Sequence, residues 1–131
     1  MSIETNRNIL TKYIDSNHSD VSMMAEDVVF TNMATGEKHN GPEAVTQMLQ
    51  FIYHVAFEAH AETRNIIINE TNAVLEGDFV GKHIGEFAGI APTNKFVKVP
   101  LCVVYDLEND KIKRARIYFE IPSLLTQLNR K

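Results

Sequence analysis

Cysteine is nearly absent from this sequence of 131 residues, since Cys102 is the only one. A single cysteine cannot form an internal disulfide, and its place in an apolar run predicts a buried, small hydrophobic side chain. With 44% hydrophobic residues, a chain of this length can bury its own core without a disulfide or a metal. We therefore expect one domain that spans residues 1–131.

Other features are missing, and each absence excludes a class of protein. The first six residues lack the basic start and the apolar core of a signal peptide, and no later stretch approaches the roughly 20 apolar residues of a membrane span. The net charge is −4, and no stripe of Lys and Arg provides the attraction on which nucleic-acid binding depends. We expect a cytoplasmic protein that binds neither membranes nor nucleic acids.

Metal and phosphate sites are not indicated either. The five histidines are dispersed and do not have the spacing of metal ligands. Gly81, Gly85 and Gly89 repeat at intervals of four, but they lack the lysine and the strand-to-helix context of a phosphate-binding loop.

The signals that are present describe an α+β chain. Ser2 can cap a first amphipathic helix, and a short helical turn at 21–25 and a strand at 27–33, expected at a sheet edge, follow it. An amphipathic helix occupies 42–55. Strands are predicted at 60–68, 73–83, 95–106 and 112–120, and a last helix at 123–128. This order predicts an antiparallel sheet with the helices on one side.

The last two strands form the clearest pair. Asn109 and Asp110 tolerate the positive φ of a hairpin turn, so residues 103–106 should pair with 112–116. In the final strand one face carries Ile112, Arg114, Arg116, Tyr118 and Glu120, and the other carries Lys113, Ala115, Ile117, Phe119 and Ile121. The face that ends in Glu120 is either solvated or the polar lining of a cavity.

We take the cavity as the working hypothesis for that face. Glu120 would then be desolvated and could remove a proton α to a carbonyl group. Arg116 could meet an enolate or a substrate carboxylate deeper in the cavity, and Tyr118 would lie beside them. The alternative is a carboxylate at the rim that pairs with a neighbour.

Other residues are candidates for the same cavity. His83 could shuttle a proton, although it faces away from Glu76 and Asp78 unless the strand bulges near Gly81. Alternatively, His83 only hydrogen-bonds the loop that follows it. Four apolar or aromatic residues could bind substrate or simply fill the core: Met48, Phe51, Tyr53 and Phe87.

Six segments, taken together, resemble the SnoaL-like polyketide cyclase (ester cyclase) family: 27–30, 39–44, 56–57, 81–95, 110–112 and 118–128. The most specific are the block Gly-x-His-x-Gly-x-Phe-x-Gly-Ile-x-Pro-Thr at 81–93 and the tail Leu-Leu-x-Gln-Leu at 124–128. The resemblance implies the NTF2-like fold, a cone in which a strongly curved sheet and helices on its concave side surround one cavity. It also implies a homodimer formed through the outer sheet face.

The resemblance further implies aldol closure of a polyketide ester by a carboxylate acid/base, with no metal or organic cofactor. Asn94, Asp110 and Asn129 stand where the family has Gly, and all three residue types tolerate a left-handed backbone. Glu120 stands where the family has Asp. Its extra methylene could change substrate choice or mark a lost activity.

Two classes of function stay open at this point. One is a cofactor-independent cyclase or isomerase that acts on a small hydrophobic or polyketide-like carbonyl compound with Glu120 as the base. The other is a dimer that binds a small molecule without turnover. A weaker enzymatic alternative resembles NTF2-like epoxide hydrolases, which use an arginine between two acids. Glu76, Asp78 and Glu120 would supply the acids, and Arg64 or Arg116 the arginine.

Overall fold

The computed structural model describes residues 2–16 and 20–129 of the chain. Its elements are, in order, α1 (Ile3–Asp15), η1 (Val21–Met23), β1 (Met24–Asn32), β2 (Lys38–Asn40), α2 (Gly41–Gln50), η2 (Phe51–Val55), β3 (Phe57–Ile68), β4 (Asn72–His83), β5 (Phe96–Glu108), β6 (Lys111–Phe119) and α3 (Ile121–Leu128). Two features were not predicted: the short strand β2, and the change from α-helix to π-helix at η2. The α+β class is confirmed.

The sheet is mixed, with strand order β2-β1-β6-β5-β4-β3. β1 runs parallel to β6, and the other neighbours are antiparallel, so the expectation of a purely antiparallel sheet was wrong. β1 was expected at the edge, but β2 pairs with its outer side. The hairpin of β5 and β6 is confirmed, with Val103 opposite Ile117 and Asp106 opposite Arg114.

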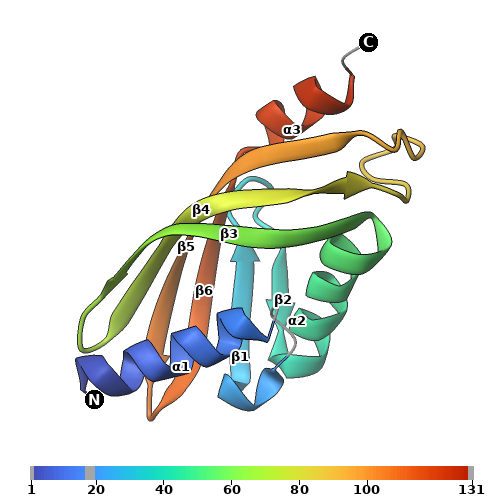
Figure 1. The fold of residues 1–131 in the computed structure, drawn as a ribbon. Helices are drawn as coiled ribbons and strands as arrows, with labels where there is room; N and C mark the ends of the chain where they lie inside the picture. The colour runs from blue at the N-terminus through green and yellow to red at the C-terminus, as the bar shows by residue number, and fades with distance from the viewer. Residues whose placement is uncertain (1, 17–19, 130–131) are drawn as a thin grey trace.

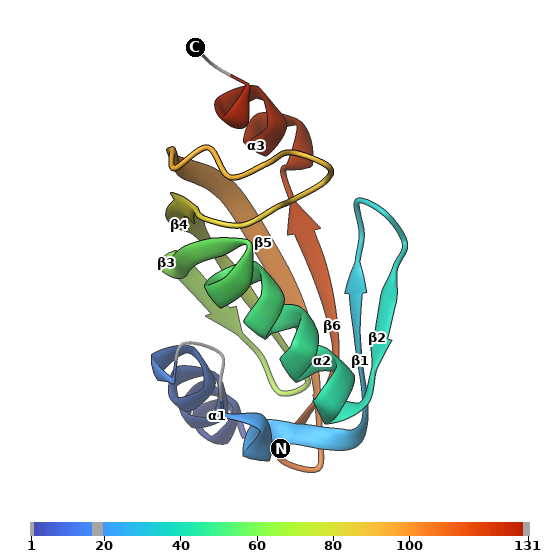
Figure 2. The ribbon, with the colours of Figure 1, turned by 90° about the vertical axis from the view of Figure 1, so that its right-hand side faces the viewer.

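The sheet curves strongly around its inner face (Figures 1 and 2). β4 does not bulge near Gly81, the condition for His83 to share a face with Glu76 and Asp78, since its register with β5 is regular there. The irregularity lies instead in β3, between Thr63 and Asn65, opposite Gly77. A Cβ atom on Gly77 would overlap the Glu62 carbonyl. Glycine therefore lets the bent β3 approach β4 closely.

The core fills the concave side of the sheet. Figure 2 shows α2 lying across this side, with α1 at one end of the sheet and α3 at the other. Every second residue of β5 from Val97 to Leu107 is buried, as alternation in a strand with one covered face requires. Tyr13 of α1 packs edge-on against Tyr105, with ring centroids 6.2 Å apart.

Local signals explain several boundaries. The Ser2 hydroxyl caps α1 by accepting a hydrogen bond from Thr5 N at 3.0 Å. Asn94 and Asp110 have φ of 59° and 62°, so both adopt the left-handed conformation expected at these family glycine positions. Asn129 does not, because its φ is −89°.

Cys102 is a correction to the sequence analysis, since it is only partly buried. It pairs with Tyr118 on the convex face of the sheet, between the buried residues Leu101 and Val103. None of the helices among the described residues is long and apolar enough to cross a membrane.

Candidate functional site

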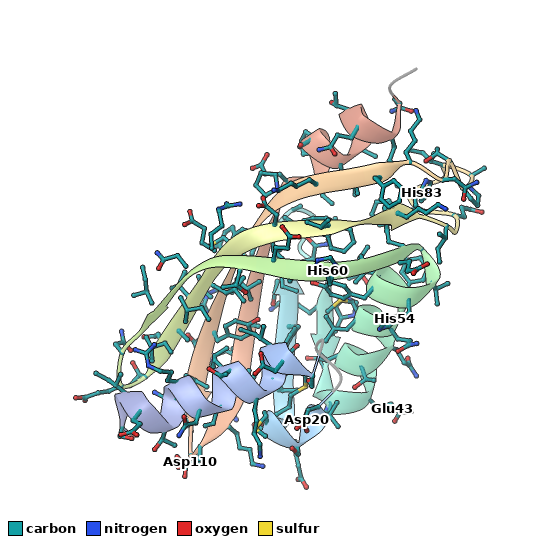
Figure 3. The ribbon with its side chains drawn as sticks, viewed as in Figure 1. Asp20, Glu43, His54, His60, His83 and Asp110 are labelled. Atoms are coloured by element: carbon teal, nitrogen blue, oxygen red, sulfur yellow. The ribbon has the colours of Figure 1, made fainter. Side chains whose placement is uncertain are left out.

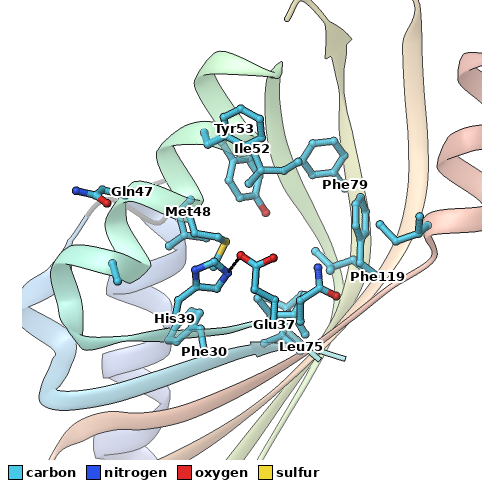
Figure 4. A pocket seen from close by; sticks show the side chains of 18 of the residues that line it. Phe30, Glu37, His39, Gln47, Met48, Ile52, Tyr53, Leu75, Phe79 and Phe119 are labelled. Atoms are coloured by element: carbon cyan, nitrogen blue, oxygen red, sulfur yellow. Dashed lines mark ion pairs between the residues drawn. The ribbon is translucent and has the colours of Figure 1, made fainter. Parts of the chain in front are cut away.

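A pocket of about 490 Å³ lies between α2, η2 and the concave face of the sheet (Figure 4). Most of its lining is aromatic or aliphatic: Tyr13, Phe30, Ala44, Met48, Leu49, Phe51, Ile52, Tyr53, Leu75, Phe79, Phe87, Leu101, Val103, Tyr105, Ile117, Phe119 and Ile121. Four polar residues complete it: Asn32, Glu37, His39 and Gln47. This volume and composition suit a small, largely apolar ligand.

The strands and the π-helical turn supply the lining for different reasons. Strand alternation brings Val103 and Tyr105 of β5, and Ile117 of β6, to the same face. At η2 the backbone N of Ala56 donates to the carbonyl of Phe51 at 2.8 Å, which closes the wider π-helical turn. This turn presents three consecutive residues, 51–53, to the pocket. Such turns are frequent at functional sites.

Three of the polar lining residues, Asn32, Glu37 and His39, come from the β1–β2 hairpin. Gly36, with φ of 79°, makes the turn, and its N donates to the carbonyl of Asn32 at 2.7 Å. The N of Asn32 donates in turn to the carbonyl of Glu37 at 2.8 Å, and His39 pairs with Phe30. The hairpin was not predicted from the sequence, and Asn32, Glu37 and His39 were not predicted as pocket residues.

Glu37 and His39 form an ion pair when the imidazole is protonated, with Oε1 and Nε2 3.4 Å apart. The two side chains differ in exposure, at 66% for Glu37 and 19% for His39. The pair therefore marks the open, polar side of a pocket whose remaining walls are apolar. Glu37 and His39 flank Lys38, but so short a segment does not show the period of a strand, and the sequence carries no clear signal for them.

Three tyrosines are among the residues that line the same pocket. Burial raises the pKa of Tyr13, Tyr53 and Tyr105 well above the ordinary value of a phenol. All three side chains are therefore protonated at neutral pH and able to donate a hydrogen bond. In Figure 4 the ring of Tyr53 reaches into the pocket from above.

The face that carries Glu120 is not the pocket face. Ile117, Phe119 and Ile121 line the pocket, while Tyr118 and Glu120 are exposed and outside its lining. Arg116 pairs with Asp106 on the outer face. From Arg114 onward the strand alternates as predicted, but the wrong face was taken as the inner one, and Ile112, which precedes a bulge at Lys113, is buried. The apolar face faces inward because burial removes its side chains from water at the least cost.

Glu76 and Asp78 also lie outside the pocket lining, on the outer face of β4. Asp78 forms an ion pair with Arg64 of β3, so an arginine does meet an acid from a neighbouring strand. The pair is on the convex side, away from the pocket. The epoxide-hydrolase alternative needs these groups inside the pocket, and the geometry does not place them there.

His83 is fully buried at the end of β4 but does not line the pocket. Its Nδ1 accepts from Thr93 N at 3.2 Å and lies 3.0 Å from the Thr93 hydroxyl. Its ring lies against Phe57, with centroids 5.1 Å apart. The alternative that His83 hydrogen-bonds the loop after it is confirmed. Its Nε2 has no hydrogen-bond partner in the described part of the chain.

The pocket brings the other candidate residues together. Its lining includes Met48, Phe51, Tyr53 and Phe87. The histidines do not meet: Figure 3 shows His54, His60 and His83 on different elements, and His18 lies outside the described residues. Within residues 2–16 and 20–129, no three His, Cys, Asp or Glu side chains are placed to hold a metal ion.

Comparison with known families decides the assignment. The family model described as SnoaL-like polyketide cyclase matches residues 10–128, which is most of the chain. The chain belongs to the SnoaL-like polyketide cyclase family. No curated protein matches the sequence.

Solved structures share the fold of this SnoaL-like protein at low identity. A candidate SnoaL-like polyketide cyclase from Jannaschia sp. CCS1 has a TM-score of 0.84 and 16% identity, over 98% of this chain and 94% of the other. A candidate polyketide cyclase from Xanthomonas campestris pv. campestris has a TM-score of 0.86 and 17% sequence identity, and the match covers 97% of this chain and 98% of the other. A protein with a ketosteroid isomerase-like fold from Catenulispora acidiphila was solved in complex with trimethylamine. It has a TM-score of 0.76 and 15% sequence identity, and the match covers 94% of this chain and 93% of the other.

These likenesses confirm the NTF2-like fold of this SnoaL-like chain. The family membership and the fold are consistent with a cyclase, an isomerase or a small-molecule-binding role. Where the resemblance implied an acid/base carboxylate in the last strand, this chain has an exposed Glu120. The carboxylate in its pocket lining is Glu37.

Proposed function

We propose that this protein binds a small, uncharged, hydrophobic carbonyl compound in its pocket and catalyses a cyclisation or isomerisation without a cofactor. The observation that carries the proposal is the division of the pocket. Its walls are aromatic and aliphatic, and its charged groups are confined to one side. Apolar walls provide binding energy, and a few fixed polar groups orient the reacting carbonyl.

The charges of the lining support an uncharged ligand. Among the described residues that line the pocket there is neither Lys nor Arg, and Glu37 carries a negative charge at its open side. A ligand carboxylate or phosphate would be desolvated there without a permanent positive partner, which is costly. A carbonyl oxygen needs only hydrogen-bond donors, and the protonated tyrosine hydroxyls provide this chemistry.

Binding without turnover is the second candidate. It uses the same apolar lining and differs only in the absence of proton transfer. Family membership covers both roles, since one fold hosts enzymes and binding proteins. Binding and turnover must therefore be measured separately.

The proposal is tested with 2-tetralone, a bicyclic ketone. Saturating 2-tetralone should raise the melting temperature of the wild-type protein, because a ligand that binds only the folded state stabilises it. Ala44→Phe adds a ring to the pocket lining and should abolish this shift. Ala91→Phe adds the same ring at an exposed position outside the lining and should keep it. Equal shifts in both variants would place the ligand elsewhere.

The proposal includes a homodimer formed through the convex face of the sheet. Supporting it are large side chains of this face with high exposure, 79% for Phe96, 61% for Ile67 and 46% for Tyr118. These apolar side chains would be removed from water where a second copy covers this face, which is favourable. Sedimentation velocity should show a dimer for the wild type and a monomer after Phe96→Lys. A monomeric wild type would contradict the dimer.

A further inference from the structure

We infer that Glu37 is the acid/base group of this pocket and that His39 positions it, an assignment that rests on the function proposed above. Among the described residues that line the pocket, Glu37 is the one carboxylate and His39 the one imidazole. Glu120 is separated from the pocket by strand alternation, although its neighbours Phe119 and Ile121 both line it. A base must lie within reach of the proton that it removes, and of these two carboxylates it is Glu37 that lines the pocket.

The backbone holds Glu37 in place from both sides. Its carbonyl accepts from Asn32 N at 2.8 Å, and its own N donates to the Thr35 hydroxyl at 3.2 Å. Figure 4 shows its carboxylate directed into the pocket, with a dashed line to His39. This ion pair engages Oε1. Oε2 is thereby left to face a ligand.

The different exposures of the pair suit different roles. With 66% of its side chain exposed, Glu37 can exchange its proton with water when the pocket is empty. The His39 side chain is only 19% exposed, and its backbone in β2 pairs with that of Phe30 in β1. His39 is therefore the more fixed partner. Glu37 is therefore the group that touches substrate, and His39 is a positioning residue that limits where the carboxylate can lie.

The proton transfer balances without an oxidant or a further reactant. The Glu37 carboxylate takes a proton from the carbon α to the carbonyl group, and the C–H electron pair moves into an enolate whose charge lies on oxygen. The Tyr53 hydroxyl is protonated and can donate to that oxygen. In an isomerisation, Glu37 returns the proton to another carbon. In an aldol closure, the enolate carbon attacks a second carbonyl, and Glu37 protonates the alkoxide.

The test follows exchange of the C1 protons of 2-tetralone for deuterium in D2O by NMR, at saturating and subsaturating ketone. Glu37→Gln should lower the saturating rate by about 100-fold or more, because general acid/base catalysis contributes at least that much. The half-saturating concentration should change by less than about threefold, because the shape of the side chain is kept. Glu37→Asp should recover part of the rate.

The controls separate Glu37 from other carboxylates and His39 from a merely structural residue. Glu120→Gln and Glu58→Gln change exposed carboxylates outside the pocket lining and should exchange at the wild-type rate. His39→Gln should lower the saturating rate about tenfold with little change in half-saturation, whereas a structural role would lower only the melting temperature.

Each remaining outcome overturns the assignment. A full rate in Glu37→Gln, or loss of the rate in Glu120→Gln, would remove Glu37 as the acid/base group. If the wild type binds 2-tetralone without accelerating exchange, the binding role stands and the assignment falls. If it neither binds nor exchanges the ketone, the proposed function falls with it.

Discussion

Arg116 and Asp106 form an ion pair with two hydrogen bonds on the outer face of the sheet, from Nη1 to Oδ2 at 2.8 Å and from Nη2 to Oδ1 at 3.0 Å. Asp106 also accepts from Nε of Arg114 at 3.1 Å and from Nδ2 of Asn72 at 2.8 Å. Four donors from two strands therefore converge on one carboxylate. An arginine that was expected to meet a substrate instead joins β5 to β6 on the side away from the pocket.

This pair predicts a loss of stability in acid. Hydrogen bonding from Arg116 is the largest cause that lowers the pKa of Asp106 from 3.8 to about 2 in the folded protein. The pKa of Asp106 is lower in the folded than in the unfolded protein. Ionised Asp106 therefore makes its full contribution to the free energy of unfolding above about pH 4, and this contribution is lost as pH falls through about 2. Because solvent screens the partly exposed guanidinium, we expect the ionised Asp106 to contribute about 1–2 kcal/mol to the free energy of unfolding.

Urea unfolding between neutral pH and pH about 2 measures this contribution. Asp106→Asn should be less stable than the wild type at neutral pH, and its stability should fall less steeply in acid. Asp110→Asn, a matched change in an exposed turn, should keep the wild-type dependence. Parallel pH curves for Asp106→Asn and the wild type would show that the pair contributes nothing.

The same pair shows where sequence reasoning stops. Apart from β2 and the π-helical η2, local patterns were sufficient for the order of the elements, for the β5–β6 hairpin and for the left-handed Asn94 and Asp110. They did not predict the parallel pairing of β1 with β6, which joins distant segments and depends on the whole fold. Nor did they predict the bulges in β3 and at Lys113, each of which reverses the inward face for the rest of its strand.

The candidate site divides in the same way. Met48, Phe51 and Tyr53 were found because apolar spacing indicates the inner side of a helix. Glu37 and His39 were missed because a three-residue strand after a turn is too short to show a period. Chemistry-based reasoning instead favoured Glu120, a carboxylate that the fold leaves in water.

A side-chain amide completes a free edge of the sheet. β6 ends opposite Leu101, and beyond it Gln127 of α3 accepts from Lys98 N at 2.9 Å and donates to Lys98 O at 2.9 Å. Gln127→Ala should lower the free energy of unfolding by about 1–2 kcal/mol, because two backbone bonds lose their partner. Hydrogen exchange of the Lys98 amide should accelerate. Thr126→Ala, an exposed change on the same helix, should leave both unchanged.

The close approach of β3 to β4 gives a steric prediction. Ala at position 77 would place Cβ against the carbonyl of Glu62, which is backbone and cannot rotate away. Gly77→Ala should therefore destabilise the fold by about 2–3 kcal/mol. Gly89→Ala should lower the free energy of unfolding by about 1 kcal/mol. The added Cβ atom meets no atom within 4 Å, so this variant carries only the backbone strain of a φ of 79°. Equal losses in urea unfolding would show that β3 can move aside.

The charge of the pocket predicts that an ester binds more tightly than its acid. Methyl 2-naphthoate and 2-naphthoate share the same rings, but only the acid must lose the hydration of a carboxylate, in a pocket lined by no Lys or Arg of residues 2–16 and 20–129. The acid also meets the like charge of Glu37. We expect the acid to bind at least tenfold more weakly at neutral pH by calorimetric titration, which is about 1.4 kcal/mol.

Glu37→Gln should reduce this difference, because it removes the like charge and keeps the shape of the side chain. Glu58→Gln, an exposed change on the outer face of β3, should keep it, since its carboxylate is outside the pocket lining. A naphthoate that binds as tightly as its ester would require a positive partner in the pocket. Protonated His39 is the residue of the lining that could supply one, so His39→Gln should then weaken the acid selectively.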